Sequence, residues 1–533
     1  MNTCKYWAAV LIAILLLPVA ASADPAKEAY EKGKACLEKK EYDAAIAALT
    51  EAIRLDPKNA QAFYKRGNVY VRQGDFDRAL ADFTEAIRLD PKSSNSYWKR
   101  GRVHYRQGDL DKAVADFSEA IRLDPKSASA HVGRGVAYGD DGKFDKAIAD
   151  YDEAIRLDPK LAPAYCSRGN TYAEKGDFEK ALADQTEAVR LDAKFAVGYY
   201  CRGTTYEKKG DFNRAITDCT EAVRLDPTDP EARCRRAAAY VKKGELDKAI
   251  ADCDEALHLN ADLADAHHYR GSAHLRKGDN EQALDDENEA IRLNPKHAKA
   301  YTNRGILYRR MGDLDAAIAQ YSEAIRLDPK LAQAHCNRGV AYGMQGNLDQ
   351  EIADCTQAMQ LDSRLAEAPY NRGVAYGFKG DNDKAIVDYT EAIRRNPNMA
   401  EAHYNRGYAY NDKGEYGKAV PDLNEAIRLN PNYVLAYNNL AWLQATCPDQ
   451  KYRNGKKAVE NATRACQLSG WRSWCLICTL GEAYAENGEF KKACESVDKA
   501  LTMASREEDK QVCRIRLDLF KQGKPYREES KKK

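Results

Sequence analysis

The sequence has almost no net charge and, beyond its first 23 residues, no long apolar run. Its 83 lysines and arginines face 82 acidic residues, so no strong field draws nucleic acid or an anionic membrane to the chain. No later stretch is apolar enough to span a bilayer. No glycine-rich phosphate loop follows a strand, and no nucleophile elbow is present. We therefore expect no enzyme, no cofactor, no nucleic-acid partner and no transmembrane domain in the mature chain.

The first 23 residues differ in composition from the rest. Lys5 is their only charge, and an unbroken apolar run extends from Ala8 to Leu17. Small residues at Ala21 and Ala23 precede Asp24, which is the three-part layout of a secretory signal peptide. The alternative is an uncleaved anchor, although the apolar run is short for a full span. We predict a signal peptide over 1–23 and an exported chain, either periplasmic or secreted.

The remaining chain repeats with a period of 34 residues. Units begin at residues 26, 60, 94, 128, 162, 196, 230, 264, 298, 332, 366 and 400, followed by an expanded unit over 434–473 and a last unit from Trp474. Position 8 is glycine in twelve of these fourteen units, from Gly33 onward, and position 27 is alanine in all of them. A fixed period of this length predicts a stack of small similar units instead of large globular domains.

Each unit has the pattern of two helices joined by a turn. Small residues at positions 8, 20 and 27 allow two helix backbones to approach, and apolar residues at positions 4, 11, 17, 21, 24 and 28 keep helical spacing. A pair such as Gly74-Asp75 combines a helix C′ glycine with an N-cap, and Pro57 ends a second helix. One hairpin cannot bury its apolar face alone, so neighbouring hairpins must stack.

These residues resemble the tetratricopeptide repeat (TPR) over about residues 26–505. The resemblance implies an all-α fold, a right-handed superhelical α-solenoid of about fourteen hairpins. It also implies that the first helices line a concave groove at positions 2, 5, 6, 9, 12 and 13, and that the partners are proteins or peptides.

We predict the following organisation: a signal peptide over 1–23, twelve repeat units over 24–433, two divergent units over 434–505, a capping helix over 506–522 and a polar tail over 523–533. The first divergent unit has an expanded turn and looks like the tail of certain exported bacterial TPR proteins. In the capping helix, Val512, Ile515, Leu519 and Phe520 are predicted to form the apolar face.

Position 7 departs from the TPR pattern, in which it is usually apolar. Here it is arginine in eleven consecutive units, and position 23 of those units is aspartate except for Gln320. A bidentate pair satisfies both groups, so we predict a structural ladder that includes Arg372 with Asp388 and Arg406 with Asp422. Such a ladder fixes register more than it adds stability.

Asparagine occupies position 6 in four successive units, where it resembles the asparagine ladder of O-GlcNAc transferases. A side-chain amide both donates and accepts, so a row of amides can hold the backbone of an extended peptide. Aromatic residues, which concentrate at binding hot spots, surround the row. The alternative is a solvated face without a ligand. The candidate peptide site comprises Asn303, Asn337, Asn371, Asn405, Tyr370, Tyr404, Tyr408 and Phe378, with Val340, Val374 and Met344 beside them.

A second candidate surface combines basic and aromatic residues at groove positions of two early units. Such a mixture suits an acidic peptide or a polyanion, and a solvated face is again the alternative. No unit has lysine at position 5, so the surface lacks the pattern of carboxylate-clamp TPR proteins. Its members are Tyr64, Lys65, Asn68, Arg72, Trp98, Lys99, Arg102, Tyr105 and Arg106.

The unit at 264–297 places ionisable groups where the family buries apolar ones. His267, His274 and Glu287 are a weak candidate for zinc, because histidine and carboxylate are zinc ligands. The alternative is a hydrogen-bonded polar patch in the core. Histidine also fills position 4 at His131 and His335 without such partners, which favours this alternative.

The cysteine positions matter in an exported chain, because disulfides can form after export. Fourteen cysteines follow residue 23, and six of them cluster near the end: Cys447, Cys466, Cys475, Cys478, Cys494 and Cys513. We expect one or two disulfides there, with a pairing that the spacing does not determine.

Taken together, the sequence predicts a non-enzymatic scaffold that binds extended peptides in its groove. The alternative is an architectural, self-associating rod of the cell envelope with no dedicated peptide ligand.

Overall fold

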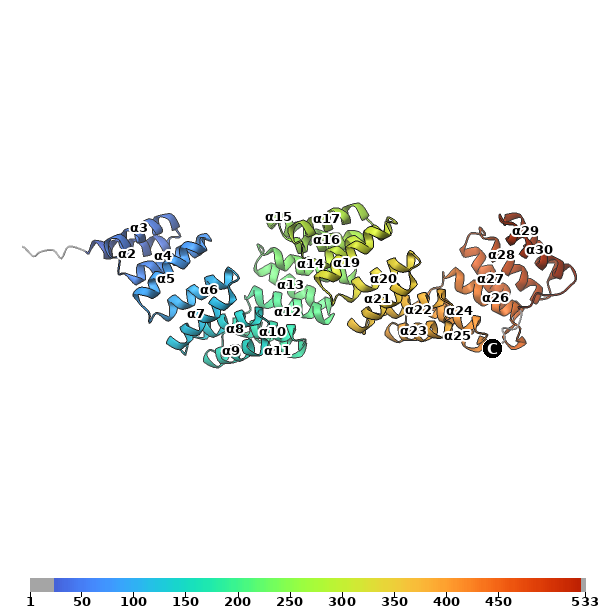
Figure 1. Ribbon diagram of the computed structural model, residues 1–533, viewed down its shortest axis with the longest axis horizontal. Helices are drawn as coiled ribbons and strands as arrows, with labels where there is room; N and C mark the ends of the chain where they lie inside the picture. Colours follow the sequence, from blue (N-terminus) through green and yellow to red (C-terminus); the bar gives the residue numbers. More distant parts are fainter. Residues whose placement is uncertain (1–23, 529–533) are drawn as a thin grey trace, which may run out of the picture. The chain divides into compact units, whose positions relative to one another are not determined.

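The structure is a computed structural model that describes residues 24–528, so the predicted signal peptide and the end of the polar tail lie outside the described residues. Residues 24–528 form 29 α-helices and one 3-10 helix and contain no strand (Figure 1). The predicted all-α hairpin repeat is therefore confirmed. The chain divides into two compact units, Met1–Ala261 and Asp262–Lys533, which are described separately.

In the first compact unit, even-numbered helices are the first helices of the hairpins and odd-numbered helices are the second. Each second helix spans fourteen residues from position 17 of its repeat. The helices are α2 (Pro25–Glu38), α3 (Tyr42–Leu55), α4 (Ala60–Gln73), α5 (Phe76–Leu89), α6 (Ser94–Arg106), α7 (Leu110–Leu123), α8 (Ala128–Asp140), α9 (Phe144–Leu157), α10 (Ala162–Glu174), α11 (Phe178–Leu191), α12 (Ala196–Lys209), α13 (Phe212–Leu225), α14 (Pro230–Lys243) and α15 (Leu246–Leu259).

The second compact unit continues the same alternation and ends with one unpaired helix. Its helices are α16 (Ala264–Lys277), α17 (Asn280–Leu293), α18 (Ala298–Arg310), α19 (Leu314–Leu327), α20 (Ala332–Met344), α21 (Leu348–Leu361), α22 (Glu367–Phe378), α23 (Asn382–Arg395), α24 (Ala400–Asp412), α25 (Tyr416–Leu429), α26 (Val434–Thr446), η1 (Gln450–Tyr452), α27 (Gly455–Leu468), α28 (Trp474–Glu486), α29 (Phe490–Met503) and α30 (Glu507–Lys521). The 3-10 helix η1 occupies the expanded turn. Between residues 24 and 528, no helix has both the length and the apolar character that crossing a membrane requires.

Glycine and aspartate form the turn inside each hairpin. Gly74 at position 15 has a φ of +81°, a left-handed conformation that glycine adopts without steric strain. Asp75 then caps α5, because its carboxylate accepts a hydrogen bond from the backbone N–H of Arg78 at 3.1 Å. A positive φ recurs at position 15 of each following unit as far as Gly414. These local signals explain why the helix boundaries repeat with the sequence period.

Small residues let the two helices of a hairpin pack closely. A Cβ atom at Gly67 would lie 2.9 Å from the ring of Phe83, and Ala79 and Ala86 of α5 are almost completely buried. The aromatic ring at position 24 thus fills the space that the glycine at position 8 leaves. Each hairpin brings its own small core to the stack.

Position 20 holds one exception to alanine, Glu351 of α21. Its side chain is only 6% exposed, and burial raises the pKa of its carboxyl to about 7. The carboxyl group lies against Gly343 of α20, where any side chain would collide with it. A glycine in the first helix therefore makes room for an acid in the second.

The last helix, α30, packs against α28 and α29, and its buried face differs from the predicted one. Cys513, Leu517 and Phe520 enter the core, whereas Val512 and Ile515 are 36% and 46% exposed. The prediction was wrong for Val512 and Ile515.

A hydrogen bond from Arg516 to a buried acid accounts for the orientation of α30. Arg516 donates from Nε to Oε1 of Glu482 at 3.0 Å, and Glu482 lies buried in α28. Because Arg516 must face α28, Leu517 and Phe520 turn inward with it and Ile515 turns outward. The guanidinium also lies 3.9 Å from the ring centroid of Tyr526, so the chain after α30 folds back over this contact.

Candidate binding surfaces on the even-numbered helices

Successive even-numbered helices contact one another within each compact unit, so their exposed side chains form a continuous surface in each unit. These surfaces carry the predicted groove positions. The predicted peptide site lies on α18 to α24 of the second unit, and the basic-aromatic residues lie on α4 and α6 of the first.

Three large apolar side chains are exposed on neighbouring even-numbered helices of the second unit. Met344 of α20 is 57% exposed, Phe378 of α22 is 78% exposed and Tyr408 of α24 is 53% exposed. Phe378 and Tyr408 line a hollow of about 290 Å³, together with Val374 and Asn405. We call this the Phe378 hollow. Large exposed apolar groups that adjoin a hollow are typical of an interaction site.

Two of the predicted asparagines join successive hairpins. Nδ2 of Asn371 donates to Sγ of Cys336 at 3.4 Å, and Nδ2 of Asn405 donates to the hydroxyl of Tyr370 at 3.1 Å. Each bond runs from position 6 of one repeat to position 5 of the repeat before it. Each contact uses one of the two N–H groups of its amide, so the side-chain carbonyl oxygen and the second N–H are what these residues can offer a ligand.

The other two asparagines have different surroundings. Nδ2 of Asn303 donates to Ser272 at 2.8 Å and to Glu287 at 2.7 Å, which uses both of its N–H groups within the fold. Asn337 accepts a hydrogen bond from Gln333 at 3.2 Å, while its Nδ2 is buried and has no partner. The four residues occupy equivalent repeat positions, but their amides are not equivalent donors.

Two predicted tyrosines, Tyr370 and Tyr404, are half-buried between helices. The hydroxyl of Tyr404 accepts a hydrogen bond from Asn439 at 2.9 Å, and its ring centroid lies 4.9 Å from that of Tyr433. Burial raises the pKa of both Tyr370 and Tyr404, so their hydroxyls stay neutral. They form the base of the surface, whereas Phe378 and Tyr408 project from it.

The arginines and aspartates of the predicted ladder pair within each hairpin. In ten hairpins, Nε and Nη2 of the arginine contact both carboxylate oxygens of the aspartate sixteen residues later. Arg372 with Asp388 and Arg406 with Asp422 have this geometry at 2.7–2.8 Å. These pairs are shielded from solvent between the helices.

The ladder also connects one hairpin to the next. Nη1 of Arg406 donates to the hydroxyl of Thr390 in the preceding hairpin at 3.1 Å. Where glutamine replaces aspartate, Arg304 donates from Nε and Nη2 to the amide oxygen of Gln320. One guanidinium therefore fixes three helices, which accounts for its recurrence.

The cations of the basic-aromatic surface lie near one another on α4 and α6. Arg72, Arg102 and Arg106 are exposed, and Lys99 is half-buried. Lys99 Nζ and the Arg102 guanidinium carbon each lie 5.0 Å from the ring centroid of Trp98. Both distances are within the range of a cation–π interaction.

The aromatic rings of this surface are engaged within the fold. Tyr64 packs against Phe83 with ring centroids 6.0 Å apart, and the hydroxyl of Tyr105 donates to Asp140 of α8 at 2.6 Å. The indole N–H of Trp98 donates to the carbonyl of Ser129 at 3.2 Å. The exposed part of the surface is therefore cationic.

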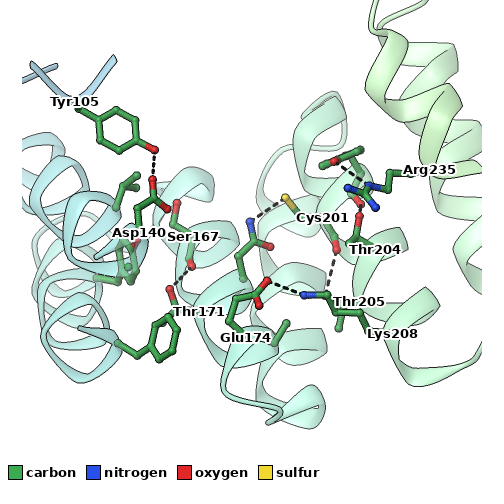
Figure 2. Close-up of a pocket in the computed structure, with 17 residues that line it drawn as sticks. Tyr105, Asp140, Ser167, Thr171, Glu174, Cys201, Thr204, Thr205, Lys208 and Arg235 are labelled. Atoms are coloured by element: carbon green, nitrogen blue, oxygen red, sulfur yellow. Dashed lines mark hydrogen bonds and ion pairs between the residues drawn. The ribbon is translucent and has the colours of Figure 1, made fainter. Parts of the chain in front are cut away.

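Sequence reasoning missed a hollow of about 500 Å³ on α8, α10 and α12 (Figure 2). Small side chains at Gly139, Ser167 and Thr204 leave it open. Two of its charged groups pair with each other, Lys208 with Glu174 at 2.6 Å, whereas Asp140 accepts a hydrogen bond from Tyr105. Small residues at successive groove positions were the sequence signal that could have located it.

The three residues considered for zinc have separate partners. Each contacts a different group: His267 lies 3.3 Å from Asp286, His274 lies 3.5 Å from Asp279, and Glu287 lies 3.0 Å from His268. Across residues 24–528, no group of three or more metal-ligating side chains occurs. This arrangement is that of a hydrogen-bonded polar core, the alternative to zinc that the sequence favours, and in it Glu287 is fully buried and also accepts from Asn303.

All fourteen cysteines between residues 24 and 528 are free thiols, so the disulfides expected near the end of the chain are absent there. Cys478 of α28 and Cys513 of α30 are neighbours in one core. The hydrogen bond with Cys513, together with burial, holds the pKa of the Cys478 thiol well above its usual value. A thiol in this state is a poor nucleophile.

Several sequence models described as tetratricopeptide repeat match the chain. Their matches cover residues 64–128, 99–162, 150–183, 196–229, 219–251, 288–319, 370–444 and 476–506. A further model, described as TPR repeat, matches residues 33–74, 169–210, 238–278 and 307–346. Comparison with curated proteins finds no match.

Several solved structures are similar to this chain. A chain of the APC/C hetero-tetramer Cut9-Hcn1 is 17% identical, with 86% of this chain and 96% of that chain covered and a TM-score of 0.58. YrrB, described as a TPR protein with an unusual peptide-binding site, is 27% identical over 34% of this chain and 95% of its own, with a TM-score of 0.28. The MamA protein is 26% identical over 32% of this chain and 94% of its own, with a TM-score of 0.30.

Proposed function

This chain belongs to the tetratricopeptide repeat family, and we propose that it is a non-enzymatic scaffold that binds extended peptide segments at the Phe378 hollow. A stack of hairpins presents side chains from many helices along one surface, and such a surface suits an extended ligand. The fold supports the general role of a protein-interaction scaffold. The position of the site is the finer part of the proposal.

The observation that carries the proposal is the row of exposed apolar side chains on α20, α22 and α24. Met344, Phe378 and Tyr408 would each leave water when a partner covers them. Fully burying one side chain of this size contributes about 1.5–3 kcal/mol, and aromatic residues beside a pocket are typical hot spots. Methionine adapts to different partner shapes, so the row favours broad over strict sequence selection.

Side-chain amides next to the apolar row supply the polar complement. The carbonyl oxygens of Asn371 and Asn405 can accept from peptide N–H groups, and the buried Nδ2 of Asn337 lacks a partner. Replacing these three residues together with alanine should weaken peptide binding about 10-fold. Unchanged affinity would remove the asparagines from the site.

Peptides selected on the parent protein from a displayed library of random 12-residue sequences are the probes for the main test. The double variant F378A/Y408A should bind the selected peptides at least 10-fold more weakly, because two hot-spot rings are removed. Val387 of α23 is 67% exposed on the second helix of the same hairpin, so V387A is the matched control. We expect its affinity to stay within 2-fold of the parent. Equal affinities for F378A/Y408A and V387A would contradict the proposal.

A second candidate function is self-association through α30. Val512 and Ile515 are exposed on this helix, on the side away from its packed face. A second copy that covers them would join molecules end to end. Sedimentation velocity should then show an oligomer for the parent and a monomer for V512S/I515S, and identical sedimentation would eliminate this role.

We also propose that residues 1–23 direct export and are removed before Asp24. The support is their composition: one charge, an apolar run and small residues at the cleavage site. Amino-terminal sequencing of protein recovered from an extracytoplasmic fraction should begin at Asp24. Recovery of a chain that retains the segment would favour the uncleaved anchor.

A further inference from the structure

Five basic side chains on α4 and α6 lack the carboxylate partners that neighbouring arginines have. In the part of the chain from residue 24 to residue 528, no ion pair to an acidic side chain is formed by Lys65, Arg72, Lys99, Arg102 or Arg106. By contrast, Arg66, which follows Lys65, and Arg100, which follows Lys99, are both paired with aspartates of the ladder. We call the five residues the basic cluster.

The members of the basic cluster are close enough to repel one another. Burial lowers the pKa of Lys99, and the charges of Arg102, Arg72 and Lys65 lower it further. Burial and the charge of Arg106 likewise lower the pKa of Arg102. Like charges held together by a folded scaffold form a local positive field, although the whole chain has a net charge of only +1. An anion placed among them would relieve the repulsion.

The equivalent surface further along the first unit shows how this chain neutralises such charges. Lys208 of α12 occupies position 13, as Arg72 and Arg106 do, and it pairs with Glu174 of α10 at 2.6 Å (Figure 2). The flanking helices α2 and α8 also have an acid at position 13, Glu38 and Asp140, but among residues 24–528 no ion pair joins either of them to the basic cluster. Asp140 of α8 is hydrogen-bonded to Tyr105.

The size of the basic cluster fits a short extended segment. Lys65 and Arg72 are seven residues apart on α4, and Lys99 and Arg106 are seven apart on α6. At 1.5 Å per residue, each pair spans about 10 Å along its helix. An extended chain advances about 3.3 Å per residue, so three or four residues of a ligand would cross the cluster.

The rings near the basic cluster argue against nucleic acid. Single-stranded nucleic acid usually binds through open aromatic faces on which bases stack. Here the ring of Tyr64 rests on Phe83, and the ring of Trp98 has Lys99 and Arg102 beside it. The remaining recognition is by charge, and guanidinium groups bind carboxylates with bidentate geometry.

We propose that the basic cluster binds an acidic segment, rich in aspartate or glutamate, of a partner protein. The segment lies along α4 and α6 with its carboxylates on Arg72, Arg102 and Arg106. This site is on the first compact unit, and it is independent of the Phe378 hollow on the second.

The test uses the full chain and a fluorescein-labelled peptide of six Glu-Gly repeats. R72Q/R102Q/R106Q should weaken binding of this peptide at least 10-fold, because three exposed contacts are removed. The matched control is R54Q/R88Q/R122Q, which removes three arginines that are about two-thirds exposed and paired with glutamates on the second helices. It should change the affinity less than 2-fold, although the net charge of the two variants is identical. Equal thermal unfolding of both variants and the parent shows that the difference reflects the site.

Three outcomes would overturn the assignment. The first is a parent that does not bind the peptide in 50 mM salt, and the second is an equal loss in both triple variants. The third is tighter binding of a 12-nucleotide single-stranded RNA than of the peptide, which would assign the cluster to nucleic acid. Selected peptides that F378A/Y408A binds more weakly should bind R72Q/R102Q/R106Q as they bind the parent, so failure here is distinguishable from failure of the proposed function.

Discussion

Glu351 occupies a position where the other thirteen repeat units have alanine, and its environment gives it an unusual titration. Burial raises the pKa of its carboxyl from 4.5 to about 7. The folded protein therefore keeps a proton that the unfolded chain releases between these two values. Stability must fall as the pH rises from about 4.5 to 7, and the full penalty remains above pH 7.

Glu351→Gln should remove this penalty, because glutamine keeps the shape of the side chain without titrating. At pH 8 we expect the variant to be more stable than the parent by about 1–3 kcal/mol, and the difference should vanish near pH 4.5. Urea unfolding at both pH values measures it. Asp349→Asn, on the same helix but 88% exposed, is the control, and we expect no such gain in stability at pH 8. A pH-independent difference for Glu351→Gln would show that the carboxyl is ionised throughout.

Arg406 binds both carboxylate oxygens of Asp422 and also reaches Thr390 in the preceding hairpin. Arg406→Ala would leave a buried carboxylate without its partner, and breaking such a pair costs about 3–5 kcal/mol. Amide hydrogen exchange in α24 and α25 should become faster. The affinity for the peptides that bind at the Phe378 hollow should stay unchanged. Arg428→Ala, which breaks an exposed pair with Glu425, serves as the control. If the two variants exchange alike, the ladder does not hold the hairpins together.

In the single helix α30, the spacing of apolar residues does not determine which face is buried. The sequence predicts a helix over 506–522, and the structure has one at Glu507–Lys521. Two apolar sets share this segment, however, and periodicity alone did not distinguish Val512 and Ile515 from Cys513 and Leu517. The choice depends on Glu482 in α28, a buried acid whose pKa burial raises to about 8 even though Arg516 opposes the rise.

Arg516→Ala should therefore loosen α30 selectively. It removes the partner of a buried carboxyl and the cation beside Tyr526. We expect amide exchange across α30 to quicken at least 10-fold, with little change in α26 and α27. Arg514→Ala is the control on the same helix, because Arg514 is 48% exposed and pairs only with Glu507 near the start of α30. Equal protection in the two variants would mean that apolar packing alone holds the helix.

The ladder makes the whole molecule sensitive to acid. Burial alone would raise the pKa values of Asp150, Asp286 and Asp422, but hydrogen bonds from the paired arginine and a histidine outweigh it and lower them. A lowered folded-state pKa contributes stability above the unfolded value of about 3.9, and this stability is lost as the pH falls through the folded value. These aspartates occur in both compact units, whereas Glu351 and Glu482, whose pKa values are raised, have the opposite dependence.

Helical circular dichroism should accordingly show a lower melting temperature at pH 2.5 than at pH 6. Asp422→Asn should flatten part of this dependence and destabilise the protein at pH 6. A melting temperature that is the same at both pH values would mean that the ladder carboxylates are not held ionised by their partners.

The sequence predicted the hairpins well because their signals are local. Gly74 and Asp75 end one helix and begin the next through their own backbone conformation and capping, without help from distant residues. It predicted the candidate sites less well because equivalent repeat positions have different neighbours. Asn303 and Asn405 both occupy position 6, yet one donates to a buried glutamate and the other to a tyrosine of the preceding hairpin.

The sequence by itself determined the period, the helical hairpin and the pairing of arginine with aspartate, because each depends on spacing along the chain. Only the tertiary structure decided which groups are left over for a partner. Phe378 is exposed and Tyr370 is half-buried although both occupy predicted groove positions, and Lys208 is neutralised where Arg72 is not. Exposure and charge neutralisation depend on the side chains of adjacent hairpins, and those contacts exist only once the hairpins have stacked.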